Sequence, residues 1–117
     1  MNGATNHHAG LSAEDRVADE YARHGLTIAA RRWRGPGGEV DLILRQGAAL
    51  VFVEVKKSRD LAGAAARISR RQMDRIMTSA AAFLAGEPGG QDTEVRFDVA
   101  LVDGMGRIAR IENAFGA

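Results

Sequence analysis

The segment from Leu50 to Lys56 constrains the fold of this chain more than any other part of its sequence. It reads Leu-Val-Phe-Val-Glu-Val-Lys, and a short run rich in valine with a central aromatic residue is typical of a buried β-strand. Because side chains alternate between the two faces of a strand, Phe52, Glu54 and Lys56 are expected on one face and the valines on the other. We therefore expect a core strand whose end presents a carboxylate and an amine side by side.

A second strand is predicted just before this one, from Val40 to Leu44, and the core strand itself is expected to begin at Ala49. Gln46-Gly47 between them favours a tight turn, so the two strands should form an antiparallel hairpin. Pairing about this turn places Asp41 opposite Val53 or Glu54. We therefore expect the carboxylates of Asp41 and Glu54 to converge at one end of the hairpin.

The rest of the chain alternates between helical and extended patterns. The elements that we expect are a helix at 12–24, strands at 26–33, 40–44 and 49–56, a helix at 62–85, and strands at 95–102 and 108–111, with a loop at 34–38. This order predicts an α/β architecture, with a central mixed β-sheet flanked by α-helices. We expect residues 1–10 to be a disordered tail and residues 11–117 to form a single domain.

Composition excludes several classes of function. The chain contains no cysteine, so disulfides, zinc–thiolate sites and thiol catalysis are ruled out. It has no apolar run near the roughly 20 residues of a membrane span, and its first ten residues lack the apolar core of a signal peptide. We therefore expect a cytoplasmic protein without a membrane partner.

Charge is unevenly distributed along the chain. Residues 31–75 contain 11 Lys and Arg against 5 Asp and Glu, a net charge of +6, whereas the rest of the chain has a net charge of −5. A basic middle favours a polyanionic partner. Solvated arginines on helix faces would explain the same pattern, and the charge distribution alone does not separate the two interpretations.

Asp41, Glu54 and Lys56 together suit phosphodiester hydrolysis. Two carboxylates held close together repel each other unless a cation lies between them, and hard oxygen ligands favour Mg²⁺, which also binds phosphate oxygens. Such a metal lowers the pKa of a bound water, and Lys56 would lie near that water and the phosphate. The alternative is a network of surface salt bridges, which are common and contribute little stability. From spacing alone this alternative is favoured, because the pattern is loose.

Three separated blocks of the sequence make the match more specific. They are Arg31–Arg34 with Gly38–Ile43 and Leu50–Lys56, then Arg96–Val99, and finally Ile111–Phe115. In order and spacing these blocks resemble the YraN family of bacterial endonuclease-like proteins, and the resemblance extends from Ala13 to Phe115. That family is similar to archaeal Holliday-junction resolvases of the PD-(D/E)xK type. The resemblance therefore implies a restriction-endonuclease-like fold with a metal site at the hairpin.

The resemblance also assigns roles to individual residues. It implies that Asp41 and Glu54 bind the metal, that the backbone carbonyl of Val55 is a third ligand, and that Lys56 is the catalytic lysine. Glu14 on the first helix matches an acidic residue that reaches the metal directly or through water.

Two further residues are candidate accessory groups. Glu39 matches the first position of the family's Glu-x-Asp pair, and its side chain alternates onto the same face as Asp41. Gln72 could project towards the site, as a glutamine does in related nucleases, or it could be a solvated helix residue.

The function that these observations predict is a DNA endonuclease that uses Mg²⁺ or Mn²⁺, with selectivity for branched DNA as a further implication. The alternative is a non-catalytic nucleic-acid-binding module on the same fold. Resolvase-type enzymes work as dimers, and the sequence leaves a homodimer open. Arg67, Arg70, Arg71 and Arg75 are expected to share one helix face that follows a phosphate backbone. The predicted nucleic-acid contacts are Arg31, Arg32, Arg34, Lys57, Arg67, Arg70 and Arg71.

Overall fold

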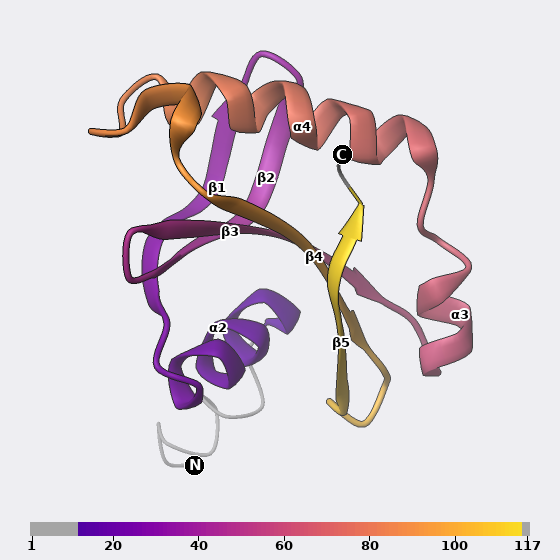
Figure 1. The fold of residues 1–117 in the computed structure, drawn as a ribbon. Coiled ribbons are helices and arrows are strands. Elements are labelled where there is room, and N and C mark those ends of the chain that lie inside the picture. Colours follow the sequence, from indigo (N-terminus) through magenta and orange to yellow (C-terminus); the bar gives the residue numbers. More distant parts are fainter. Residues whose placement is uncertain (1–11, 116–117) are drawn as a thin grey trace, which may run out of the picture.

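A computed structural model describes residues 12–115, which form one five-stranded sheet with helices on both faces (Figure 1). The strands lie in the order β1-β2-β3-β4-β5; the β3–β4 pair is parallel and the other three pairs are antiparallel. The elements are α2 (Ala13–Arg23), β1 (Thr27–Gly35), β2 (Gly38–Gln46), β3 (Ala49–Lys57), α3 (Leu61–Ala65), α4 (Arg70–Leu84), the 3₁₀ turn η1 (Gly90–Asp92), β4 (Val95–Val102) and β5 (Ile108–Phe115). The expected α/β class is confirmed, and the mixed sheet with flanking helices is consistent with a restriction-endonuclease-like fold.

The alternation of β3 divides the core into two layers, as predicted. Val51, Val53 and Val55 pack with the apolar face of α2, whereas Phe52 packs with α4 on the opposite face of the sheet. In Figure 1, α2 lies below the sheet and α4 above it. Glu54 and Lys56 share the Phe52 face and therefore point towards α4.

The β2–β3 hairpin forms in one of the two predicted registers, but its turn lies one residue later than expected. Leu42 pairs with Val53, and Gln46 pairs with Ala49, so the two-residue turn is Gly47-Ala48 rather than Gln46-Gly47. Gly47 has φ = +61°, a value that glycine adopts without the steric penalty of a side chain. Continuing this register places Asp41 directly opposite Glu54, which strengthens the expected convergence.

The helix predicted over 62–85 is wrong as a single element. Asp60 caps α3 and Ser69 caps α4, each by accepting a hydrogen bond from a backbone N–H in the first turn of its helix. Ser69 has extended backbone angles, so the helix must restart there. Arg67 consequently lies between the helices and does not share a helix face with Arg70, Arg71 and Arg75.

Two other boundaries also differ from the expectations. The segment 34–38 is a tight turn rather than a loop, because β1 extends to Gly35 and β2 begins at Gly38. Strand β5 continues to Phe115 through a left-handed residue, Asn113 (φ = +53°). The tail predicted for residues 1–10 lies outside the described residues. None of the helices within 12–115 has the length and apolar character that a membrane span requires.

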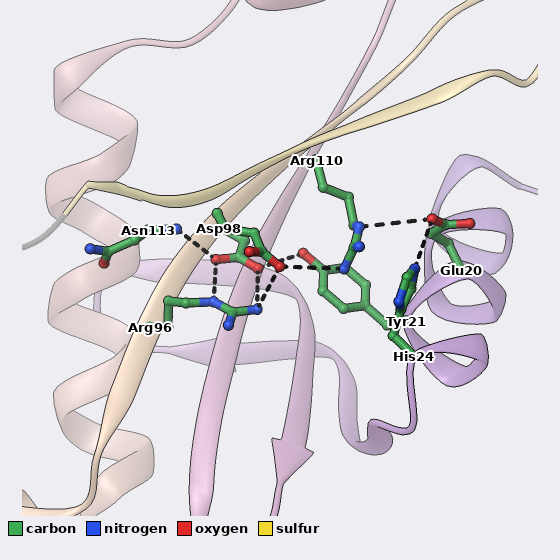
Figure 2. A network of polar contacts seen from close by, with 8 residues as sticks. Glu20, Tyr21, His24, Arg96, Asp98, Arg110 and Asn113 are labelled. Atoms are coloured by element: carbon green, nitrogen blue, oxygen red, sulfur yellow. Dashed lines mark hydrogen bonds and ion pairs between the residues drawn. The ribbon is translucent and has the colours of Figure 1, made fainter.

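A buried polar network joins α2 to β4 and β5 (Figure 2). Asp98 is fully buried; it accepts hydrogen bonds from the Tyr21 hydroxyl (2.7 Å), from Arg96 (2.8 and 2.9 Å) and from the backbone N–H of Asn113 (2.9 Å). The Arg110 guanidinium lies 5.0 Å from the centre of the Tyr21 ring. Because every oxygen of the buried carboxylate has a partner, the network stabilises the packing of α2 without leaving an orphan charge.

Candidate active site

A pocket of about 290 Å³ lies where the β1–β2 turn meets the first half of α4. Its lining is mostly polar and comes from three parts of the chain: the β1–β2 turn with the start of β2, the end of β3, and the first half of α4. The lining residues are Gly37, Gly38, Glu39, Asp41, Glu54, Gln72, Arg75 and Ile76. Two of the three predicted catalytic residues, Asp41 and Glu54, therefore share one pocket.

Asp41 lies beyond the last paired position of β2 with β3. The paired register ends at Leu42 and Val53, and the backbone N–H of Val55 donates to the Asp41 carboxylate at 2.8 Å. A side-chain oxygen thus takes the place of a strand–strand backbone bond. This contact holds Asp41 against the end of β3, beside Glu54.

Glu54 is an almost fully buried carboxyl group, with 5% of its surface exposed. Its pKa is raised to about 8, chiefly by burial and then by the neighbouring Asp41 carboxylate, while Lys56 partly opposes both effects. Desolvation and a like charge each disfavour the ionised form. A cation between the two carboxylates would reverse both effects, so the pocket has the electrostatics of a cation site.

Lys56 reaches the same group of side chains from two residues further along β3. Its ammonium nitrogen lies 3.2 Å from a Glu54 carboxylate oxygen, and it donates a hydrogen bond to the amide oxygen of Gln72. The amide nitrogen of Gln72 donates to the same Glu54 oxygen. Gln72 therefore bridges the carboxyl group of Glu54 and the amine of Lys56. Of the two positions considered for Gln72 from the sequence, the structure shows the one directed towards the site.

The β1–β2 turn is fixed to α4 by one buried hydroxyl. The side chain of Ser79 is fully buried; it accepts a hydrogen bond from the N–H of Gly37 (3.0 Å) and donates one to the carbonyl of Gly38 (2.8 Å). A Cβ atom on Gly37 would lie 2.2 Å from the backbone oxygen of Arg75, so only glycine permits this close approach. The contact sets the two walls of the pocket against each other.

The other predicted acidic residues occupy different positions. Glu39 lines the pocket and lies 3.8 Å from Arg34. Glu14 lies on α2, and its carboxylate is 3.5 Å from Arg32. Glu14 does not line the pocket, and residues 12–115 hold no group of three or more His, Cys, Asp or Glu side chains arranged for a metal ion. Its role as a metal ligand, like that of the Val55 carbonyl, stays a prediction.

Comparison with known proteins places the chain in a family. The family model described as "Uncharacterised protein family UPF0102" matches residues 13–102, a span that includes the hairpin, α4 and β4. The chain belongs to the UPF0102 family. The UPF0102 proteins are the YraN family, so the resemblance drawn from the three sequence blocks is confirmed.

Curated relatives support the assignment to UPF0102 over the full length. The chain is 62% identical to a UPF0102 protein of Cereibacter sphaeroides, with all of both chains covered. It is 57% identical to one of Ruegeria pomeroyi, over 97% of this chain and 93% of that protein. A UPF0102 protein of Dinoroseobacter shibae is 46% identical, over 90% of this chain and 78% of that protein. The names of these relatives state no activity, so membership in UPF0102 shows common ancestry but does not identify a reaction.

The basic residues predicted for nucleic-acid contact fall into two groups in this UPF0102 chain. The three arginines of β1 are paired: Arg31 with Asp15, Arg32 with Glu14, and Arg34 with Glu39. Of the others, Arg67, Arg70 and Arg71 are exposed on the α3–α4 side, where Arg67 donates a hydrogen bond to the carbonyl of Lys57. Lys57 itself is exposed at the end of β3, beside Ser12 and Arg16 on the α2 side of the sheet. The exposed residues of this second group are Lys57, Arg67, Arg70 and Arg71.

Sequence reasoning did not place Ser79, which holds one wall of the pocket, or Arg75, which lines it. The burial of Ser79 had a signal, because this serine lies beside Ile76 and Ala80 on the apolar stripe of α4. Arg75 was grouped with other helix arginines and not placed at the pocket, because its position depends on the turn docked against it. Trp33 packs edge-on against Phe83, with ring centres 5.2 Å apart.

Proposed function

We propose that this chain is a metal-dependent DNA endonuclease that hydrolyses phosphodiester bonds at the pocket between the β1–β2 turn and α4. The observation that carries the proposal is the pair of carboxylates, Asp41 and Glu54, in one polar pocket with Lys56 beside them. Such a set supplies ligands for a cation and a positive charge for a phosphate. The fold class and the resemblance to PD-(D/E)xK nucleases support the same conclusion.

The donor set fits Mg²⁺ or Mn²⁺. Both carboxylates offer hard oxygen atoms. The raised pKa of Glu54, which burial and the proximity of Asp41 produce, means that its negative charge is only partly compensated by Lys56. Asp41 and Glu54 would hold the ion from the two strands of the hairpin. Such an ion lowers the pKa of water and polarises a phosphoryl oxygen.

The remaining residues have separate tasks around this centre. Lys56 is placed to orient or deprotonate the attacking water, or to stabilise negative charge on the phosphate. Gln72 keeps Lys56 and Glu54 at fixed positions by bonding to both. Arg75 lines the pocket and supplies a second positive charge for the DNA strand.

The experiment is incubation of the protein with a four-way junction, a flap and a plain duplex, each with Mn²⁺, Mg²⁺ or EDTA. We expect nicking that requires a metal and is fastest on branched DNA. Asp41→Asn and Lys56→Ala should each lower the rate by about 10²–10³-fold, as loss of a charge-stabilising group commonly does. Asp74→Asn, an exposed carboxylate on the same α4 helix, is the matched control and should cut at the wild-type rate.

The outcomes separate this proposal from the alternative of a non-catalytic nucleic-acid-binding module. A wild-type protein that binds these DNAs but nicks none of them with either metal would support the module and contradict the endonuclease. Nicking that persists at the wild-type rate in Asp41→Asn would show that the reaction takes place elsewhere on the protein or in a contaminant.

A further inference from the structure

The arginines near the pocket differ in whether protein carboxylates already neutralise them. On β1, Arg31 lies 2.5 Å from Asp15 and Arg34 lies 3.8 Å from Glu39. Each of these guanidinium groups is balanced by a neighbouring negative charge. A guanidinium group that stays paired with a carboxylate neutralises no phosphate and releases no counterion from the DNA, so it adds little to the binding of a polyanion.

The first half of α4 has the opposite character. Within the described residues, Arg71 and Arg75 form no ion pair, and both are exposed. Its first turn contains two arginines and no acidic residue, so the positive end of the helix dipole adds to their charge. This half of the helix carries the unneutralised positive charge nearest to the pocket.

Position links this charge to the proposed chemistry. Arg71 and Arg75 are four residues apart on α4, so their side chains are neighbours, about 5–6 Å apart at Cβ. Successive side chains of an α-helix are rotated by about 100° around its axis. Arg71 and Arg75 therefore lie on the flank of α4 next to Gln72, which faces the pocket. Arg75 itself lines the pocket together with Asp41 and Glu54.

We propose that the DNA backbone is bound by the flank of α4 that carries Arg71 and Arg75, and not by the arginines of β1. This inference rests on the proposed function, because it takes the strand at the pocket to be DNA. The two guanidinium groups contact phosphates next to the one that lies at Asp41 and Glu54. The strand therefore runs along the first half of α4, and the ion-paired arginines of β1 remain bound to their carboxylates.

The test is the salt dependence of binding to a fluorescently labelled DNA duplex, measured by anisotropy in EDTA so that no metal-dependent cleavage occurs. Each phosphate contact contributes about 0.9 to the slope of log K against log salt concentration. Arg71→Gln and Arg75→Gln should each lower the slope by about 0.9, and the double variant by about twice that. Arg31→Gln and Arg34→Gln, which remove the same charge from β1, should leave the slope unchanged.

The inference would be overturned if the wild type did not bind DNA at low salt. It would also be overturned if Arg71→Gln and Arg75→Gln kept the wild-type slope, or if the β1 variants lost as much slope as the α4 variants. Tighter binding to an RNA duplex of the same sequence would overturn DNA as the partner. Failure of the proposed nuclease activity can be distinguished from failure of the proposed binding surface. Wild-type protein that shows the expected slopes but never cuts with Mg²⁺ or Mn²⁺ contradicts the endonuclease and leaves the binding surface standing.

Discussion

The Glu54 carboxyl group is the single residue on which the chemistry of the pocket depends most. Its position on the same face as Lys56 follows from strand periodicity and was predicted from the sequence alone. Its approach to Asp41 was predicted, but two registers were left open, because the turn position within Gln46-Gly47-Ala48 is not visible in a hydrophobic pattern. The bridge from Gln72 to Glu54 depends on packing between distant segments, so the sequence left it undecided.

The first prediction concerns Glu54 and pH. The pKa of Glu54 is about 8 in the folded protein, well above its ordinary value of 4.5, because of burial and the nearby Asp41. A folded pKa above the unfolded one means that the contribution of this group to stability is full below pH 4.5 and is lost as pH rises towards 8. Urea denaturation of the metal-free protein across this range should show the loss, and Asp41→Asn should reduce it.

The control for that prediction is Asp74→Asn, which removes an exposed carboxylate of α4 and should preserve the wild-type pH dependence. Saturating Mg²⁺ should also flatten the wild-type curve, because the ion binds the ionised form. A wild-type protein and an Asp41→Asn variant with identical pH dependence would contradict the described coupling of the two carboxyl groups.

The second prediction concerns Gln72. Its amide donates to Glu54 and accepts from Lys56, and hydrogen bonds to charged groups contribute about 1.5–3 kcal/mol each. Gln72→Ala should lower metal-dependent nicking by about 10–100-fold, and Gln72→Glu should do no better, because a carboxylate cannot donate to Glu54. Gln91→Ala, which removes an exposed glutamine that contacts Ala81, should leave the nicking rate unchanged. Equal rates in both alanine variants would contradict the bridging role.

At the scale of elements, the strands followed the sequence more closely than the long helix. The predicted strands at 40–44, 49–56 and 95–102 lie within β2, β3 and β4. The helix predicted over 62–85 is broken, because Ser69 caps a new helix. Its hydroxyl accepts a hydrogen bond from the Gln72 N–H, in place of the backbone carbonyl that a continuous helix would offer. The alanine-rich composition of this segment conceals that break. The docking of the β1–β2 turn on α4 was not predicted. Close contact between two backbones is visible in a sequence only as a cluster of glycines, which does not indicate the partner segment.

The third prediction concerns this docking. Ser79→Ala would leave the N–H of Gly37 and the carbonyl of Gly38 without their partner, which costs about 1–3 kcal/mol in the free energy of unfolding. Gly37→Ala should cost more, because its Cβ would meet the Arg75 carbonyl. Urea denaturation measures both. Gly86→Ala, where the nearest atom is 3.7 Å away, is the matched control. A Gly37→Ala variant as stable as the Gly86→Ala control would contradict the tight docking.

At the scale of the whole molecule, the sheet separates the face that carries the pocket from the face that carries the Asp98 network. The pocket lies on the α4 face, whereas the Asp98 network lies between the sheet and α2 on the other face (Figures 1 and 2). The mixed sheet and its flanking helices were predicted, but the strand order and the face that each helix covers depend on long-range contacts. The Arg96–Val99 block was recognised as a family feature before the structure connected Arg96 and Asp98 to Tyr21.

The fourth prediction tests the Asp98 network. Tyr21→Phe keeps the buried ring but removes the hydroxyl that donates to Asp98 at 2.7 Å. Because the acceptor is a buried carboxylate, we expect a loss of about 1.5–3 kcal/mol in the free energy of unfolding. His24→Ala, which removes an exposed partner of Glu20 on the same helix, should change stability by less than about 0.5 kcal/mol. A Tyr21→Phe variant with wild-type stability would contradict the role of the network in holding α2.

The central claim is that Asp41 and Glu54 share one divalent cation, and titration of Mn²⁺ into the metal-free protein by calorimetry tests it most directly. The wild type should bind one ion at this site, more tightly as pH rises towards 8, where Glu54 loses its proton. Asp41→Asn and Glu54→Gln should each abolish that binding, while Asp74→Asn should retain it. Wild-type Mn²⁺ affinity in either pocket variant, or no binding by the wild type, would contradict the claim.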